Sequence, residues 1–175
     1  MRGDHALVRP AAYDDLDVVA GILGRYATSI VVTFEESPPS VAQWRERLDG
    51  LAERGLPFLV ADVSGAVVGY AYASPWRAKP AYRHTAEDSV YLAPGWTGRG
   101  LGRQLLHALL AACPAAGVRQ IITVIADTGD PASEALHRAC GFTSAGRLTQ
   151  VGCKHGRWID TVLLQRAIRP ACADD

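Results

Sequence analysis

The chain has 175 residues, of which 49% are hydrophobic and 21% charged, so we expect one globular domain over residues 1–175 rather than a disordered chain. Eighteen Lys and Arg residues balance eighteen Asp and Glu residues, which excludes a strongly basic footprint for nucleic acid. There is no long apolar run, no secretory leader and no C-x-x-C pair among the four cysteines, so we expect a cytoplasmic protein that binds neither membranes nor metal.

Hydrophobic periodicity and turn signals divide the chain into strands and helices. The expected strands are residues 6–9, 58–63, 66–73, 89–92, 120–125, 148–152 and 158–164. The expected helices begin at Asp14, at Ser40, after the glycine-rich stretch 95–102 and at Asp130, where the residue types suit helix N-termini. Antiparallel strands come first and strand–helix–strand units come later, an order that predicts a mixed α/β sheet.

A glycine-rich turn lies between an expected strand and an apolar-faced helix, and it reads Thr97-Gly98-Arg99-Gly100-Leu101-Gly102. Glycine lets the backbone turn tightly and approach a ligand, and the free N–H groups of a helix N-terminus attract anions. Arg99 and Arg103 add positive charge, so the turn would suit a pyrophosphate. The spacing lacks the last glycine of a dinucleotide fingerprint and the Gly-Lys-Ser/Thr of a P-loop, and an ordinary strand-to-helix turn is the alternative.

Several segments together resemble the GNAT superfamily of N-acetyltransferases. The turn at residues 97–102 matches the glycines of its cofactor motif, the strand before the turn is similar to the one that holds pantetheine, and residues 130–142 resemble its second cofactor segment. The resemblance implies a central, mostly antiparallel sheet that is splayed at the cofactor strand and flanked by helices, with acetyl-CoA as co-substrate. The implied cofactor-binding residues are Val90, Tyr91, Leu92, Thr97, Gly98, Arg99, Gly100, Leu101, Gly102, Asp130 and Ser133.

A closer resemblance is to the phosphinothricin and methionine sulfone acetyltransferases. The segments that carry it are residues 33–35, 76–78, 82–83, 87–91, 136–137, 141–142 and 154–158. It implies acetylation of a small amino-acid-like amine, and a homodimer, because the related enzymes are commonly dimeric. Thr97 departs from the family's Arg or Gln and leaves one phosphate contact open, whereas Asp130 replaces a usual Asn and could repel phosphates.

Amide formation from a thioester needs a base for the amine, stabilisation of the carbonyl oxygen and an acid for the thiolate. The resemblance places Glu87 before the cofactor strand and facing the cleft, so we predict that it is the base, acting through a water. Burial or the neighbouring Asp88 would raise its pKa. His137 is the candidate acid for the sulfur, or a second base, and the resemblance implies an oxyanion contact near Leu92. A solvated Glu87 and a structural His137 are the alternatives.

A basic segment between residues 75 and 85 is the expected substrate side of the site. An amino-acid substrate brings a carboxylate, with which Arg pairs in a bidentate fork. The predicted substrate-binding residues are Phe34, Trp76, Arg77, Tyr82, Arg83 and Lys154. The alternatives are a solvated basic loop and aromatic residues that belong to the core.

Two other functions fit the same motifs. A protein N-terminal acetyltransferase would need an open groove for a peptide, and the basic segment weakly favours a small anionic substrate over an extended chain. A CoA-binding module without catalysis would fit the departures at Thr97 and Asp130, but Glu87 and His137 argue against it.

Overall fold

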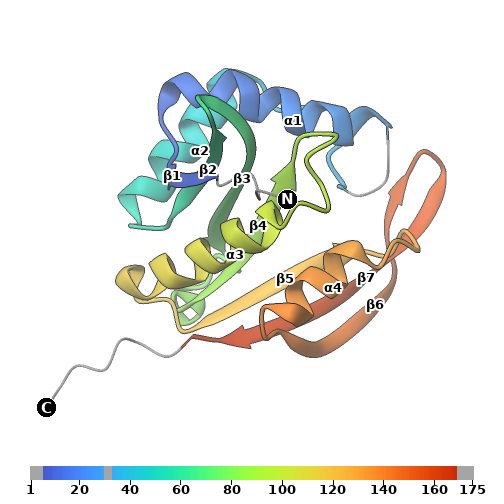
Figure 1. The fold of residues 1–175 in the computed structure, drawn as a ribbon. Helices are drawn as coiled ribbons and strands as arrows, with labels where there is room; N and C mark the ends of the chain where they lie inside the picture. The colour runs from blue at the N-terminus through green and yellow to red at the C-terminus, as the bar shows by residue number, and fades with distance from the viewer. Residues whose placement is uncertain (1–5, 30–32, 169–175) are drawn as a thin grey trace, which may run out of the picture.

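The computed structural model describes residues 6–29 and 33–168, and these form a seven-stranded sheet with helices on both faces (Figure 1). The strands are β1 (Leu7–Pro10), β2 (Phe58–Val63), β3 (Ala66–Pro75), β4 (Thr85–Leu92), β5 (Gln120–Ala126), β6 (Thr143–Lys154) and β7 (Arg157–Ala167). They lie in the order β1-β2-β3-β4-β5-β7-β6, and only the β4–β5 pair is parallel within the described chain. The mixed, mostly antiparallel sheet expected from the sequence is confirmed.

Helices cover the sheet in two pairs (Figure 1). The helices are α1 (Leu16–Ser29), α2 (Val41–Glu53), α3 (Leu101–Ala112) and α4 (Ala132–Ala139), and the single 3₁₀ turns are η1 (Tyr13–Asp15), η2 (Pro80–Tyr82) and η3 (Cys113–Ala116). The first pair, α1 and α2, covers one face, whereas α3 and α4 cover the other. No helix among residues 6–29 and 33–168 is long and apolar enough to cross a membrane.

Each face of the sheet has its own core, because successive side chains of a strand point to opposite faces. Phe58 and Val60 of β2 pack with the helices α1 and α2, and Leu59 and Ala61 pack with α3. Both cores are anchored by fully buried side chains, which include Leu16, Val19, Trp44 and Tyr70 on the first face and Leu101, Leu105, Leu106 and Leu109 on the second. The strands that carry the candidate site are therefore packed against helices on both faces of the sheet.

The helix start expected at Ser40 is confirmed, whereas α4 begins at Ala132, two residues after the start expected at Asp130, with Pro131 as its N-cap. Ser40 and Gln43 exchange hydrogen bonds between side chain and backbone, with N···O distances of 2.8 and 3.2 Å, as in a capping box. The Asp130 Oδ1 atom still accepts from the Ala132 amide at 2.9 Å, so the carboxylate satisfies the first backbone donor of α4 from just outside the helix.

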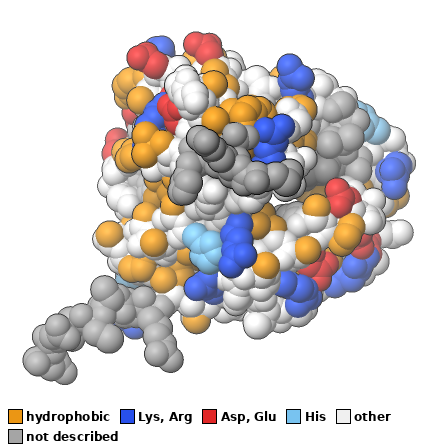
Figure 2. Space-filling model, viewed as in Figure 1, with side chains coloured by type: hydrophobic (Ala, Val, Ile, Leu, Met, Phe, Trp, Pro, Cys, Tyr) orange, Lys and Arg blue, Asp and Glu red, His pale blue; other side chains and the backbone are white. Residues whose placement is uncertain are grey.

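Two strands begin several residues earlier than the sequence predicted. β4 begins at Thr85 and β6 at Thr143, several residues before the starts at 89 and 148. Polar residues begin both strands, so the local pattern gave no strand signal. Hydrogen bonding to neighbouring strands, which a local pattern cannot reveal, extends them. Basic and acidic side chains are interspersed on the face shown in Figure 2, in keeping with the balanced charge of the chain.

Gly69 of β3 lies directly opposite Leu92 of β4, where a side chain has no room. A Cβ atom at Gly69 would lie 2.5 Å from Leu92 Cδ2 and 2.9 Å from the Tyr91 carbonyl oxygen. We expect Gly69→Ala to lower the free energy of unfolding by about 1–3 kcal/mol, the usual cost of overpacking, as measured by urea denaturation.

Gly21→Ala is the matched control, because no atom lies within 4 Å of a Cβ at this position of α1. Alanine is favoured over glycine within helices by roughly 0.5–1 kcal/mol, so this variant should be slightly more stable. A Gly69→Ala protein as stable as the wild type would contradict the close contact between β3 and β4.

Candidate functional site

The candidate site opens where β4 and β5 separate. Residues 85–87 pair in parallel with residues 120–122, and the pairing ends there. β4 continues along β3 as far as Leu92, whereas β5 pairs with β7 along its whole length. A cavity of about 660 Å³ lies between the diverging strands, large enough for a small ligand.

The open edge of β4 directs backbone groups toward this cavity. The Ala93 amide donates to the Val68 carbonyl at 2.8 Å. The backbone N–H and C=O groups of odd-numbered residues in β4 therefore point to β3, and those of even-numbered residues point to the opposite edge of the strand. The N–H groups of Val90 and Leu92 consequently point to the β5 side, beyond the last β4–β5 pair. The Tyr26 hydroxyl of α1 donates to the Leu92 carbonyl at 2.6 Å and fixes the end of this strand.

The glycine turn connects the end of β4 to the N-terminus of α3 (Figure 1). Gly95, Gly98 and Gly100 have φ angles of 82°, 75° and 82°, in the left-handed region that glycine adopts without strain. No atom lies within 4 Å of a Cβ built at any of the three, so a ligand can approach their backbone. Thr97 lines the cavity, and Gly100 caps α3, so free amides of the first helical turn lie beside it. This turn fits a pyrophosphate.

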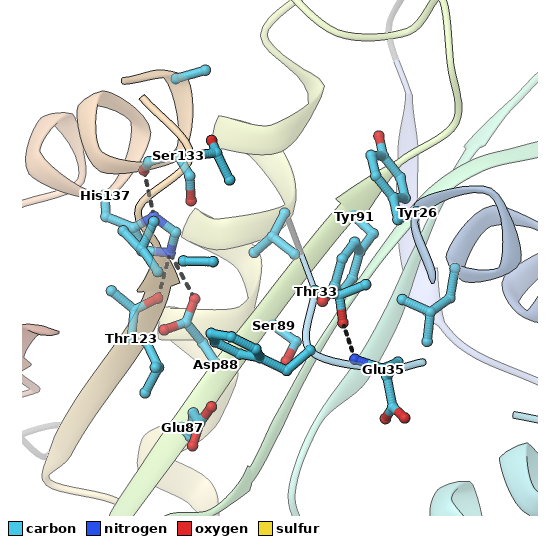
Figure 3. A pocket seen from close by; sticks show the side chains of 18 of the residues that line it. Tyr26, Thr33, Glu35, Glu87, Asp88, Ser89, Tyr91, Thr123, Ser133 and His137 are labelled. Carbon is cyan, nitrogen blue, oxygen red and sulfur yellow. Dashed lines mark hydrogen bonds and ion pairs between the residues drawn. The ribbon is translucent and has the colours of Figure 1, made fainter. Parts of the chain in front are cut away.

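Glu87 lines the cavity in a half-buried position. Burial raises the pKa of its carboxyl group, the charge of Asp88 raises it further, and Arg77 opposes these effects. Glu87 and Asp88 are consecutive residues of a strand and therefore project to opposite sides, as Figure 3 shows. A carboxyl group with a raised pKa is better matched to proton transfer near neutral pH than an ordinary one.

Asp88 and His137 form a buried pair on the α4 side of the cavity (Figure 3). The exposed fractions are 5% for Asp88 and 4% for His137, and the His137 Nε2 atom lies 2.8 Å from Asp88 Oδ2. The Nδ1 atom lies 2.7 Å from the Ser133 carbonyl oxygen, and Thr123 Oγ1 lies 3.3 Å from Nε2. Both ring nitrogens of His137 thus have partners within the protein.

Negative charge predominates around the cavity. Glu35, Glu87, Asp88 and Asp130 line it, only Asp88 is paired with His137, and Lys and Arg are absent from the described residues of its lining. Such a lining attracts an ammonium group. In residues 6–29 and 33–168, no group of three or more His, Cys, Asp or Glu side chains is arranged to hold a metal ion.

The part of the chain that contains the splayed β4–β5 edge and the glycine turn matches a known family. The family model described as "Acetyltransferase (GNAT) family" matches residues 19–142, well over half of the chain. The chain belongs to the GNAT family. As a member of it, the protein is an acetyltransferase whose co-substrate is acetyl-CoA.

Relatives of this GNAT protein include amino-acid acetyltransferases. A phosphinothricin N-acetyltransferase of Alcaligenes faecalis is 47% identical over 92% of this chain and 82% of its own length. An L-methionine sulfoximine/L-methionine sulfone acetyltransferase of Pseudomonas paraeruginosa is 37% identical over 94% of this chain and 96% of its own. The crystal structure of a GNAT superfamily phosphinothricin acetyltransferase from Sinorhizobium meliloti in complex with AcCoA is 43% identical, with a TM-score of 0.89 over 97% of this chain and 92% of that one.

The structure brings many of the predicted GNAT site residues around one cavity. Those that line it are Phe34, Glu87, Val90, Tyr91, Thr97, Asp130, Ser133 and His137. The predicted cofactor residues outside this lining are Leu92, Gly98, Arg99, Gly100, Leu101 and Gly102. Leu101 is fully buried in the core, so its side chain faces away from a ligand and only its backbone is available.

The predicted substrate residues divide into four groups in space, of which buried Lys154 is one. Arg77, Tyr82 and Arg83 line a separate hollow of about 120 Å³, and only Arg77 acts on the pKa of Glu87. Trp76 lies in the lining of neither space and stacks against the Arg77 guanidinium, whose Cζ atom is 4.6 Å from the ring centroid. Phe34 alone of the predicted substrate residues lines the large cavity.

Lys154 is buried and lies outside the cavity lining. Its exposed fraction is 1%, and its Nζ atom donates to the Thr33 carbonyl oxygen at 2.7 Å. The Phe34 ring lies over Gly152 of β6, where a Cβ atom would collide with it. The C-terminal hairpin therefore holds the segment that carries Phe34 and Glu35.

Several residues of the cavity lining were not identified as site residues from the sequence, and four of them carry hydrogen-bonding or charged groups that matter for the chemistry. These four are Tyr26, Glu35, Asp88 and Thr123. Strand alternation could have separated Asp88 from Glu87 and given it a role of its own. Tyr26 lies on the apolar face of a helix, where an aromatic residue gives no signal that distinguishes a site from the core.

Gly100→Ala tests the glycine turn as an anion site. The substitution strains a left-handed position and places a methyl group in open space beside the expected phosphates. We expect acetyl-CoA affinity to fall about tenfold or more, equivalent to roughly 1.4 kcal/mol, as measured by isothermal calorimetry.

Gly65→Ala is its matched control. Gly65 has a φ of 85° and equally open surroundings, but it lies in the β2–β3 turn outside the cavity lining. Both variants should lose similar stability, and only Gly100→Ala should lose affinity. Equal affinities in the two variants would remove the turn from the acetyl-CoA site.

Proposed function

We propose that this GNAT acetyltransferase transfers an acetyl group from acetyl-CoA to the amino group of a small amino-acid-like substrate of the phosphinothricin or methionine sulfone type. The observation that carries the proposal is the position of Glu87, a half-buried carboxyl group with a raised pKa in the cavity where β4 and β5 separate. The names of the relatives supply the substrate class.

Acetyl-CoA fits the glycine turn and the open edge of β4. Amides of the turn at residues 97–102 would hold its pyrophosphate, and the Val90 backbone would bind its pantetheine arm. When bound, it supplies an activated acetyl group as a thioester. The Asp130 carboxylate already accepts from the Ala132 amide, so it contributes to α4 rather than directly to a phosphate.

The carboxylates of the cavity would bind and activate the amine. Glu35 and Glu87 attract an ammonium group, and Glu87 accepts a proton from it through a water molecule as the nitrogen attacks. Backbone N–H groups of β4, at Val90 or Leu92, would donate to the thioester oxygen as negative charge develops on it. The chain's contribution is thus one base and a fixed set of hydrogen-bond donors.

The substrate's acidic group needs a cation, and Arg77 is the predicted residue best placed to supply one. It is close enough to lower the pKa of Glu87, whereas Tyr82 and Arg83 line the neighbouring hollow. Phe34 would form the opposite wall of the cavity. We keep all four as proposed substrate residues, with Arg77 nearest to the reaction.

The proposal also includes a single domain that forms a homodimer in the cytoplasm. Large apolar side chains are exposed on the C-terminal hairpin, with exposed fractions of 45% for Leu148, 53% for Val151 and 65% for Trp158. Apolar surface of this kind often marks a contact between subunits. Light scattering should give twice the mass of one chain, and Trp158→Ser should shift the equilibrium toward monomers. A wild-type protein that is monomeric at micromolar concentration would contradict the dimer.

Glu87→Gln tests the mechanism directly. The amide keeps the shape of the side chain but cannot accept a proton, so kcat should fall roughly 10²-fold or more. Thiol release from acetyl-CoA should be measured with phosphinothricin, methionine sulfone and alanine-initiated peptides. Glu46→Gln on the exposed face of α2 is the matched control. Unchanged turnover in Glu87→Gln would contradict the role of Glu87 as the base. A preference for the peptides would indicate a protein N-terminal acetyltransferase.

The same residue sets the acid side of the pH profile. Because burial and Asp88 raise the pKa of Glu87, kcat/KM should fall as the pH decreases through a value above that of an ordinary glutamate. The protonated carboxyl group cannot accept the amine proton. The residual activity of Glu87→Gln should lack this acid limb, and the same limb in the variant would assign it to another group.

A further inference from the structure

The Asp88–His137 pair has a proton arrangement that its hydrogen bonds determine. The Ser133 carbonyl oxygen can only accept, so the neighbouring Nδ1 atom of His137 carries a proton. An ionised Asp88 can also only accept, so Nε2 carries a second proton directed at Oδ2. If the shared proton moved to Asp88, it would still occupy the Nε2 lone pair. The ring therefore has no free nitrogen with which to remove a proton from an amine.

Several elements surround this pair, and the side chains that they contribute are uncharged. Thr123 comes from β5, Cys113 from η3 after α3, and Cys140 follows α4. Burial raises the pKa of both thiols and the charge of Asp88 raises it further, which keeps the thiols neutral. The ring of Phe142 stands edge-on to the imidazole, with centroids 5.1 Å apart.

The charged side chains further from the His137 ring interact with other groups. Arg103 and Arg166 act on Cys140, and the His107 Nε2 atom lies 3.9 Å from the Cys140 sulfur. Glu87 is the neighbouring carboxyl group on β4, and its pKa responds to the charge of Asp88. Among these groups, Asp88 alone contacts the His137 ring with a charge.

Desolvation and pairing act on His137 in opposite directions. Burial lowers the pKa of the imidazole, but the hydrogen bond to Asp88, its charge and the Ser133 carbonyl outweigh burial, and the pKa is raised. The Asp88 Oδ1 atom is buried and lacks a hydrogen-bond partner among the described residues, although Asp88 lines the cavity. An acceptor left in this way is available to a ligand or a water, which a pair built only for stability would not require.

We propose that Asp88 is a positioning residue that keeps His137 protonated, so that His137 presents a fixed positive charge to the cavity and does not act as a base. This inference rests on the proposed acetyl transfer. In that reaction, negative charge develops on the thioester and then on the departing thiolate. A charged imidazolium in the wall of the cavity stabilises that charge while both of its protons stay on the ring.

Asp88→Asn removes the charge and keeps the shape of the side chain. Titration of the His137 ring, followed by NMR in protein with labelled histidine, needs no substrate. We expect the wild-type ring to remain protonated through neutral pH and the variant to titrate about 1–3 pH units lower. His137→Gln assigns the resonance among the five histidines.

The pH profile of kcat/KM gives a second readout. Activity should decrease at alkaline pH as the His137 ring loses its proton. This alkaline limb should move to lower pH in Asp88→Asn by the same interval as the ring titration. The pKa of the substrate amine is the same for both proteins and cannot cause the difference. Asp88→Glu should restore much of the wild-type profile. Asp49→Asn, which removes a carboxylate that contacts Tyr13 on the surface, should move neither readout.

A wild-type His137 that is neutral at pH 7 would overturn the inference, and so would an Asp88→Asn ring that titrates like the wild type. If Asp88→Asn does not fold, the wild-type titration and the Asp88→Glu profile decide. If no amine is acetylated but the ring titrates as expected, the proposed function fails while the protonation by Asp88 stands.

Discussion

The early end of the β4–β5 pairing is the constraint on which the site depends. The two strands separate after residue 87 because each follows a different partner: β4 stays on β3 as far as Leu92, and β5 stays on β7. The Tyr26 hydroxyl holds the end of β4 from the α1 side. A parallel pair that continued would have used the β4 amides in a ladder and left no cavity.

Both segments that follow these strands begin helices beside the cavity. The turn after β4 leads into α3, and Asp130 leads into α4. Ligands of α/β sheets bind outside the carboxyl ends of the strands for this reason, since helix N-termini gather there. Glu87 and Asp88 of β4 and Glu35 of the loop after α1 line the same space. The cavity therefore offers positive helix ends to phosphates and negative side chains to an amine.

Adjacent residues of β4 have different chemical environments. Glu87 projects to one side, where burial and a neighbouring charge make it a better base, and Asp88 projects to the other, where it pairs with His137. One carboxyl group is left to titrate, and the other is committed to an ion pair. Successive side chains of a strand point to opposite faces of the sheet, and this alternation separates the two roles.

Local sequence determined the elements and the chemistry that each carries. Apolar periodicity and turn signals predicted the strands and α-helices of the described chain, the capping box at Ser40 formed as expected, and the glycine turn follows β4. Glu87 and His137 were identified as candidates, and both line the cavity. These features depend on neighbours within a few residues, which a sequence displays directly.

Tertiary structure decided which of those residues meet. The basic segment lies beside a second hollow, and Lys154 is turned inward to the Thr33 backbone. The contact between Asp88 and His137 joins residues 49 positions apart. Such contacts depend on strand order and on where two strands diverge, and these follow from long-range pairing and packing that no local pattern specifies.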